Sequence, residues 1–234
     1  MRKRQVDCEL YNDITPIIFT DGIEMKNLIA ELSPCNAAMV VGVAFITSVI
    51  IVTFIDDILL ANFVVPGDTA ALARDIETNG KLFGFAVVGY LFVLALDSII
   101  GLALYVVLKP ANKNLALLTT VLRLLYVGIL VSGLFSMVFQ IIDIYGYAKI
   151  KLFGYIFFAL HIFVLGYSVF KSGYIPKSIG ILLIFASFTY IVFFVDIHLP
   201  EILEVIIMLT MAIAELSLCV WLMVKRNRLP QNSI

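Results

Sequence analysis

The chain has 234 residues, of which 62% are hydrophobic and 14% charged, and its mean hydropathy is +1.06. Soluble domains have roughly 45–50% apolar and about 25% charged residues, so this composition excludes a water-soluble globule. The 16 basic and 17 acidic residues give a net charge of −1, without the basic bias of nucleic-acid-binding proteins. We therefore expect no nucleic-acid partner, and look for partners among lipids, small polar molecules and other membrane proteins.

Six apolar runs are long enough to cross a bilayer, which takes about 20 residues of α-helix. Charged or helix-breaking residues bound each run, and the runs lack the alternating pattern of a membrane β-barrel. The sequence predicts an all-α, polytopic membrane protein whose transmembrane domain, 37–224, is a bundle of six helices at 37–55, 82–108, 115–142, 152–170, 178–196 and 202–224. Segments 1–36 and 225–234 are expected to be a cytoplasmic N-terminal segment and a cytoplasmic tail.

Basic residues are distributed unevenly between the two sides of this bundle. If the N-terminus is inside, 11 of the 16 Lys and Arg residues are cytoplasmic, and Arg123 lies within a span. The far side holds Arg74, Lys81, Lys149 and Lys151. Because cytoplasmic loops carry the excess of Lys and Arg, we predict a multi-pass protein of the cell membrane with both termini cytoplasmic.

Two segments outside the spans have patterns of their own. Residues 17–32 are modestly amphipathic, which fits a helix lying at the inner membrane interface or a short solvated helix. In the long outer loop, Asp68 is a suitable N-cap for a helix over 69–78. We expect that helix to lie along the outer surface.

Four ionisable side chains fall inside the predicted spans, each in a different one: Asp97, Arg123, His161 and Glu215. Each lies 10 to 12 residues from a lysine at the predicted cytoplasmic boundary. At 1.5 Å per residue, this spacing places all four in one layer, roughly 15–18 Å from that boundary. Ionisable groups inside a membrane are expensive, face the bundle interior, and indicate a functional site.

Within such a layer, Arg123 is expected to pair with Asp97 or Glu215, and His161 to complete the network. Two alternatives remain: the four residues only hold helices together, or Arg123 reaches part of the way to the inner interface instead. No HExxH motif is present, and no cofactor motif is found. With two histidines in all, we predict no metal site, although a set of His161, Asp97 and Glu215 stays open.

Small residues recur on one face of the third span. Gly128, Ser132 and Ser136 are spaced four residues apart, which aligns them along the helix. Such a stripe lets a second helix approach closely. We interpret it as a helix-packing surface.

Several stretches resemble a bacterial and archaeal membrane family catalogued as domain of unknown function 4386. The first group comprises 65–71 (VPGDTAA), Asp97, 104–118 (LYVVLKPANKNLALL) and 123–124 (RL). The later groups comprise 161–167 (HIFVLGY), 172–176 (SGYIP), 180–183 (GILL), 215–218 (ELSL) and 221–222 (WL). The resemblance runs from about the first span to the end of the chain.

This resemblance implies a six-helix bundle and assigns no activity. In many members an acidic residue follows the Arg-Leu pair of the third span, whereas this chain has Leu125, Tyr126 and Val127 there. Asp97 or Glu215 must then balance Arg123.

Three hypotheses for the function follow. In the first, the charged layer is a binding or transport-like site for a small polar ligand, a lipid headgroup or a proton. In the second, His161 and a carboxylate act as acid and base in an intramembrane enzyme, although no catalytic motif supports it. In the third, the chain is a structural or accessory membrane subunit.

Overall fold

The computed structural model describes residues 32–56, 78–139, 141, 144–194 and 200–230. This part of the chain is helical and contains no strand. Its elements are α2 (Pro34–Phe54), α4 (Gly80–Leu108), α5 (Lys113–Val138), α6 (Ile144–Ser172), α7 (Lys177–Phe194), α8 (Glu201–Lys225) and the short 3-10 helix η2 (Arg226–Arg228). The predicted all-α fold class is confirmed.

Five of these helices are long and apolar enough to cross a membrane: Pro34–Phe54, Gly80–Leu108, Lys113–Val138, Lys149–Ser172 and Ile202–Arg228. The sixth, Lys177–Val192, is apolar but shorter. Large apolar side chains on the outer faces are exposed, including Ile50, Phe85, Phe188 and Leu209. An outer surface of this kind suits contact with lipid rather than water, as expected of a membrane protein.

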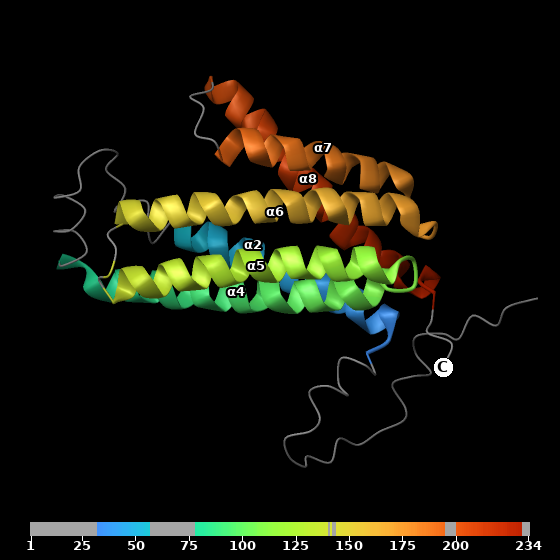
Figure 1. Cartoon of the computed structure of the whole chain (residues 1–234), viewed down its shortest axis with the longest axis horizontal. Helices are drawn as coiled ribbons and strands as arrows, with labels where there is room; N and C mark the ends of the chain where they lie inside the picture. Colours follow the sequence, from blue (N-terminus) through green and yellow to red (C-terminus); the bar gives the residue numbers. More distant parts are fainter. Residues whose placement is uncertain (1–31, 57–77, 140, 142–143, 195–199, 231–234) are drawn as a thin grey trace, which may run out of the picture.

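The helices form a closed ring. Each packs against the next in the order α2, α4, α5, α6, α7 and α8, and α8 packs back against α2. Consecutive helices run in opposite directions along the bundle (Figure 1). Side chains on the inner faces of all six helices can therefore meet near the axis of the ring.

Local sequence explains several helix ends. Ser33 accepts a hydrogen bond from the Asn36 N–H at 3.2 Å and so caps α2, with Pro34 in the first turn. Asn112 caps α5 in the same way, accepting from two backbone N–H groups at 3.0 Å each. Gly173, with φ +74°, adopts the left-handed conformation that ends α6.

Two predicted boundaries differ from the structure by a turn of helix or more. The third span is predicted to reach residue 142, but α5 ends at Val138. The fourth span was expected to start at residue 152, but α6 already begins at Ile144. Tyr147 and Ile150 lie against Gly133 of α5, and this packing extends α6 by about two turns beyond the apolar run. The amphipathic segment 17–32, apart from Leu32, and the expected helix at 69–78, apart from Thr78, lie outside the described residues.

The close approach of helices occurs at glycines other than the predicted one. A Cβ added to Gly166 would come within 2.8 Å of the Gly180 carbonyl oxygen, so α6 and α7 touch backbone to backbone. Gly128 has no atom within 4 Å of such a Cβ, and Gly128 and Ser132 are exposed. α5 turns the face of Gly128 and Ser132 outward, and Gly128 contacts no described helix of this chain. The interpretation of the Gly128, Ser132 and Ser136 stripe as a helix-packing surface therefore stays a prediction.

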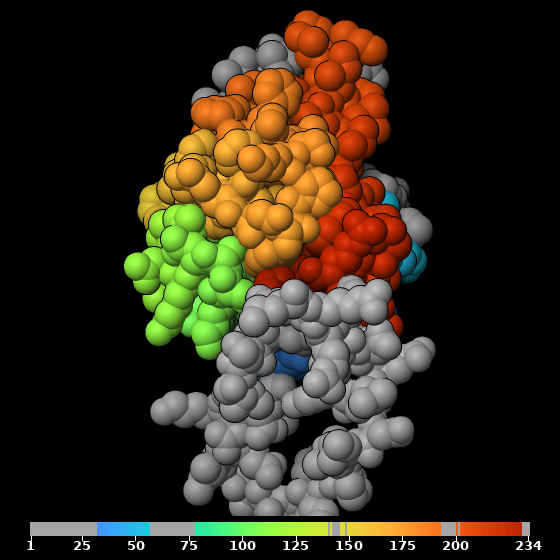
Figure 2. Space-filling model, turned by 90° about the vertical axis from the view of Figure 1, so that its right-hand side faces the viewer, coloured from blue at the N-terminus to red at the C-terminus, as the bar shows by residue number. Residues whose placement is uncertain are grey.

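Basic residues gather at one end of the bundle. Lys109, Lys113, Lys171, Lys177 and Lys225 all stand at helix ends that the alternating directions bring together, at the right of Figure 1. Figure 2 looks onto this end, with α5 in green, α6 and α7 in orange and α8 in red. The orientation of this end in the cell remains a prediction.

Candidate functional site

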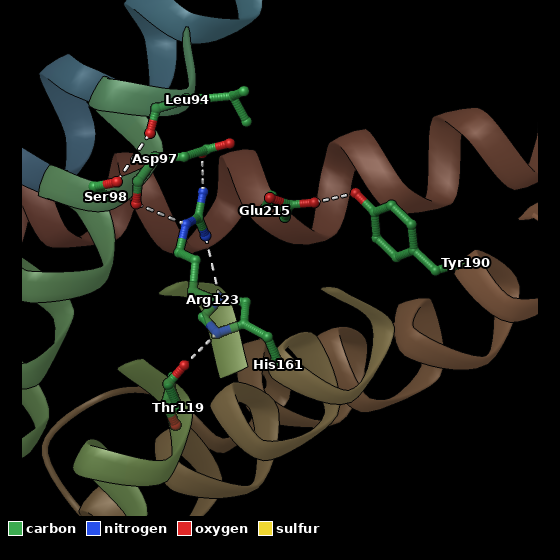
Figure 3. A network of polar contacts seen from close by, with 8 residues as sticks. All are labelled: Leu94, Asp97, Ser98, Thr119, Arg123, His161, Tyr190 and Glu215. Carbon is green, nitrogen blue, oxygen red and sulfur yellow. Dashed lines mark hydrogen bonds and ion pairs between the residues drawn. The ribbon is translucent and has the colours of Figure 1, made fainter. Parts of the chain in front are cut away.

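The four ionisable residues of the spans all have buried side chains in the ring. They come from four helices: Asp97 from α4, Arg123 from α5, His161 from α6 and Glu215 from α8 (Figure 3). His161 is fully buried, and the other three are at most 8% exposed. The structure thus brings together the residues that the cost of burying charge had singled out.

Arg123 binds Asp97 through two separate contacts. Its Nη2 lies 2.5 Å from Asp97 Oδ1 in an ion pair, and its Nε donates to the Asp97 backbone carbonyl at 3.1 Å. The arginine stem lies along α4 beside Gly101, where a Cβ would be 3.4 Å from Arg123 Cδ, an ordinary van der Waals distance. Thr120 donates to the Gly101 carbonyl at 2.9 Å, which fixes α5 at this level of α4.

His161 is held at both ring nitrogens. Nδ1 lies 2.7 Å from the Thr119 backbone carbonyl, and Nε2 lies 3.1 Å from Arg123 Nη1. A carbonyl only accepts and a guanidinium only donates, so the neutral tautomer with its proton on Nδ1 satisfies both contacts. His161 therefore positions the guanidinium, and neither nitrogen is left for acid or base chemistry.

Glu215 belongs to a different contact from the Arg123 ion pair. Tyr190 of α7 donates a hydrogen bond from its hydroxyl to Glu215 Oε1 on α8. Arg123 forms its ion pair with Asp97 and, among the described residues, none with Glu215. Glu215 still acts electrostatically on Arg123, so the two carboxylates and the guanidinium form one charged group.

Phe158 of α6 connects these contacts. The Arg123 guanidinium lies over its ring, 5.5 Å from the centroid. The ring also packs edge-on against Tyr190 at 5.2 Å and tilted against Tyr126 at 4.9 Å. The charged group is therefore bounded by aromatic surface on the α5, α6 and α7 side.

Sequence reasoning missed Tyr190, Phe158 and the Thr119 carbonyl. Tyr190 stands 13 residues after Lys177, close to the spacing used for the charged residues, so the same count applied to tyrosines would have found it. Phe158 is one of 18 phenylalanines and carries no distinguishing pattern. The backbone carbonyl of Thr119 has no counterpart in the sequence at all.

The charges of the group do not cancel. Asp97 and Glu215 carry two negative charges when ionised, Arg123 carries one positive charge, and His161 is neutral in the tautomer described above. Burial of an uncompensated charge costs several kcal/mol. With both carboxylates ionised, the group therefore carries one excess negative charge.

The alternative metal set does not form. No three His, Cys, Asp or Glu side chains of the described helices are grouped so that they could hold a metal ion. His161 also has both nitrogens engaged, so a set of His161, Asp97 and Glu215 is contradicted.

Comparison with known proteins adds a family and no activity. The chain is 37% identical over 123 residues to an uncharacterized protein of Archaeoglobus fulgidus, and the alignment covers 53% of this chain and 74% of that relative. No solved structure matches the chain. The family model described as domain of unknown function (DUF4386) matches residues 40–149 and 138–225, a region that includes all four ionisable residues of the layer. The chain belongs to this family, DUF4386.

Proposed function

We propose that this chain is a binding or transport-like membrane protein whose ring of helices accepts a small, positively charged species at the Asp97, Arg123 and Glu215 group. One observation carries the proposal: Arg123 is already paired with Asp97, so Glu215 supplies a second carboxylate that forms no ion pair with any residue the structure describes. A buried carboxylate in this position takes up a proton or a cation.

The net charge of the Asp97, Arg123 and Glu215 group also discriminates among the three occupants considered from the sequence: a small polar ligand, a lipid headgroup and a proton. A group with one excess negative charge repels an anionic lipid headgroup and an anionic metabolite. It attracts a proton, a metal cation or a cationic small molecule. Among small polar ligands, we therefore propose one that carries positive charge.

The two other hypotheses receive less support from the contacts. An enzyme that uses His161 as acid or base needs a free ring nitrogen, but both nitrogens are bonded to Thr119 and Arg123. In a purely structural layer, the second carboxylate would contribute only its hydrogen bond with Tyr190, and apolar residues of similar volume pack as well or better.

Unfolding of the purified protein in detergent tests the proposal. The unfolding temperature of the unaltered protein is measured over a range of pH and with alkali cations, and the same series is run with Glu215→Gln. We expect the occupant to stabilise the folded state by mass action, and Glu215→Gln to remove that response. A response identical in both proteins, or absent from both, contradicts the proposal.

A further inference from the structure

Ser48 of α2 is exceptional among the serines of this bundle. Its Oγ is the one buried side-chain nitrogen or oxygen in the described helices that makes no hydrogen bond, and the residue is 7% exposed. A helical serine ordinarily satisfies its hydroxyl on the carbonyl three or four residues earlier. The serines that do so here are Ser98, Ser132, Ser136, Ser168, Ser172, Ser187 and Ser217.

The register of α2 against α4 places Ser48 opposite Asp97. Tyr90 of α4 donates a hydrogen bond to Asp56, two residues after the end of α2, and a Cβ at Gly89 would lie 2.6 Å from Ile55 Cδ1. Ser48 lies eight residues before Asp56 and seven before Ile55. Because the two helices are antiparallel, the same distance along α4 leads forward from Tyr90 to residue 98 and from Gly89 to residue 96. Asp97 is the centre of that interval.

The register of α2 against α8 places Ser48 at the level of Glu215. A Cβ at Gly42 would meet the Met223 side chain and lie 3.5 Å from the Cys219 carbonyl oxygen. Ser48 is six residues after Gly42, which corresponds to residues 213–217 of the antiparallel α8. Glu215 is the centre of this interval, so Ser48 stands at the level of both carboxylates.

Each carboxylate retains an oxygen that can serve as a ligand. Asp97 uses Oδ1 for Arg123, and Glu215 uses Oε1 for Tyr190. Asp97 Oδ2 and Glu215 Oε2 have no hydrogen bond to any described residue. α2 packs against both α4 and α8, so its hydroxyl and these two oxygens come from three adjoining helices.

We infer that Ser48, Asp97 and Glu215 form a site for one small monovalent cation such as sodium. This inference rests on the proposed function, and adds to it the identity of the occupant and a third ligand. Hard cations take carboxylate and hydroxyl oxygens. One positive charge brings Asp97, Glu215 and Arg123 to neutrality, whereas a divalent ion would leave an excess. A proton on Glu215 gives the same balance but leaves the Ser48 hydroxyl without a partner.

Sodium dependence of stability tests the site. The full chain is purified in detergent at one fixed pH, and NaCl replaces choline chloride at constant ionic strength while the unfolding temperature is recorded. We expect Na⁺ to raise the unfolding temperature, and K⁺ to raise it less. Direct binding of ²²Na⁺ to the same preparation provides a second measurement.

Two serine variants separate ligation from packing. Ser48→Ala removes an unbonded hydroxyl, so its unfolding temperature in choline should equal or exceed that of the unaltered protein, while its apparent affinity for Na⁺ should fall roughly tenfold or more. Ser187→Ala is the matched control, because Ser187 is also buried, at 2% exposed, but its hydroxyl is bonded to the Ile184 carbonyl. It should respond to Na⁺ as the unaltered protein does.

The possible failures are distinguishable. An unchanged Na⁺ response in Ser48→Ala, with loss of the response in Glu215→Gln, overturns the role of Ser48 and leaves the proposed function standing. If the unfolding temperature of the unaltered protein does not change with Na⁺ but depends on pH, and Glu215→Gln abolishes the pH dependence, the occupant is a proton and the sodium site is refuted. If neither response depends on Glu215, the inference and the proposed function both fail.

Discussion

Arg123 holds Asp97 at two points, the carboxylate and the backbone carbonyl of the same residue. The second contact means that the guanidinium is bound to the α4 main chain as well as to a side chain. Replacement of the Asp97 side chain therefore leaves Arg123 bonded to the α4 main chain. Replacement of Arg123 leaves the Asp97 carboxylate buried without its counter-charge.

The first prediction concerns this pair. Arg123→Met should lower the free energy of unfolding by about 3–5 kcal/mol, because it leaves Asp97 ionised and buried without a partner. Combining it with Asp97→Asn should recover part of that loss. SDS-induced unfolding in mixed micelles measures all members of the cycle.

A second cycle with Glu215→Gln serves as the control. Since Glu215 makes no ion pair with Arg123 in the described structure, its coupling to Arg123 should be smaller than that of Asp97. Additive effects of Arg123→Met and Asp97→Asn would show that the two residues are not paired in the folded protein.

The second prediction concerns the positioning role of His161. His161→Phe leaves the Thr119 carbonyl without its donor and Arg123 Nη1 without its acceptor, which should cost about 2 kcal/mol or more. The variant should also weaken the coupling between Arg123 and Asp97, because the guanidinium loses one of the contacts that orient it. The same unfolding measurement gives both quantities.

Tyr167→Phe is a suitable comparison on the same helix. Tyr167 is 40% exposed on the outer face of α6, so removal of its hydroxyl should change the free energy of unfolding by less than about 0.5 kcal/mol. If His161→Phe leaves the Arg123–Asp97 coupling intact, His161 does not position the arginine.

Much of the fold could be predicted from the sequence, because the lipid environment demands long apolar helices and charged residues mark their ends. The boundary of α6 was missed for a physical reason: Tyr147 and Ile150 extend the helix by packing on Gly133, and hydropathy does not register such a contact. The same holds for helix pairing. Gly128 has the spacing of a packing glycine, yet only the assembled bundle shows that its face points outward.

Of the site, the four ionisable residues could be predicted from the sequence. Asp97, Arg123, His161 and Glu215 stand out because burying them is expensive. The choice of Asp97 over Glu215 as the partner of Arg123 depends on how the helices are rotated, which the sequence does not specify. Ser48 was invisible for another reason, since a serine in a helix ordinarily bonds its own backbone and gives no sign when it does not.

The third prediction compares two glycines. Gly166→Ala should destabilise the protein by about 1–3 kcal/mol, because its new methyl group would meet the α7 backbone, which cannot move aside as a flexible side chain can. Gly128→Ala should be neutral or slightly stabilising, because its methyl group meets nothing and alanine favours the helix. Equal losses of unfolding free energy in both variants would contradict the close contact between α6 and α7.

The fourth prediction is the orientation in the membrane. Lys149 and Lys171 are exposed lysines at opposite ends of α6, and Lys171 belongs to the end where the basic residues gather. The excess of basic residues predicts that this end faces the cytoplasm. In a variant without its native cysteines, a membrane-impermeant thiol reagent applied to intact cells should label Lys149→Cys and leave Lys171→Cys unlabelled. Permeabilised cells provide the control, because both positions should then react. Labelling of position 171 but not 149 in intact cells would invert the topology and place the basic end outside.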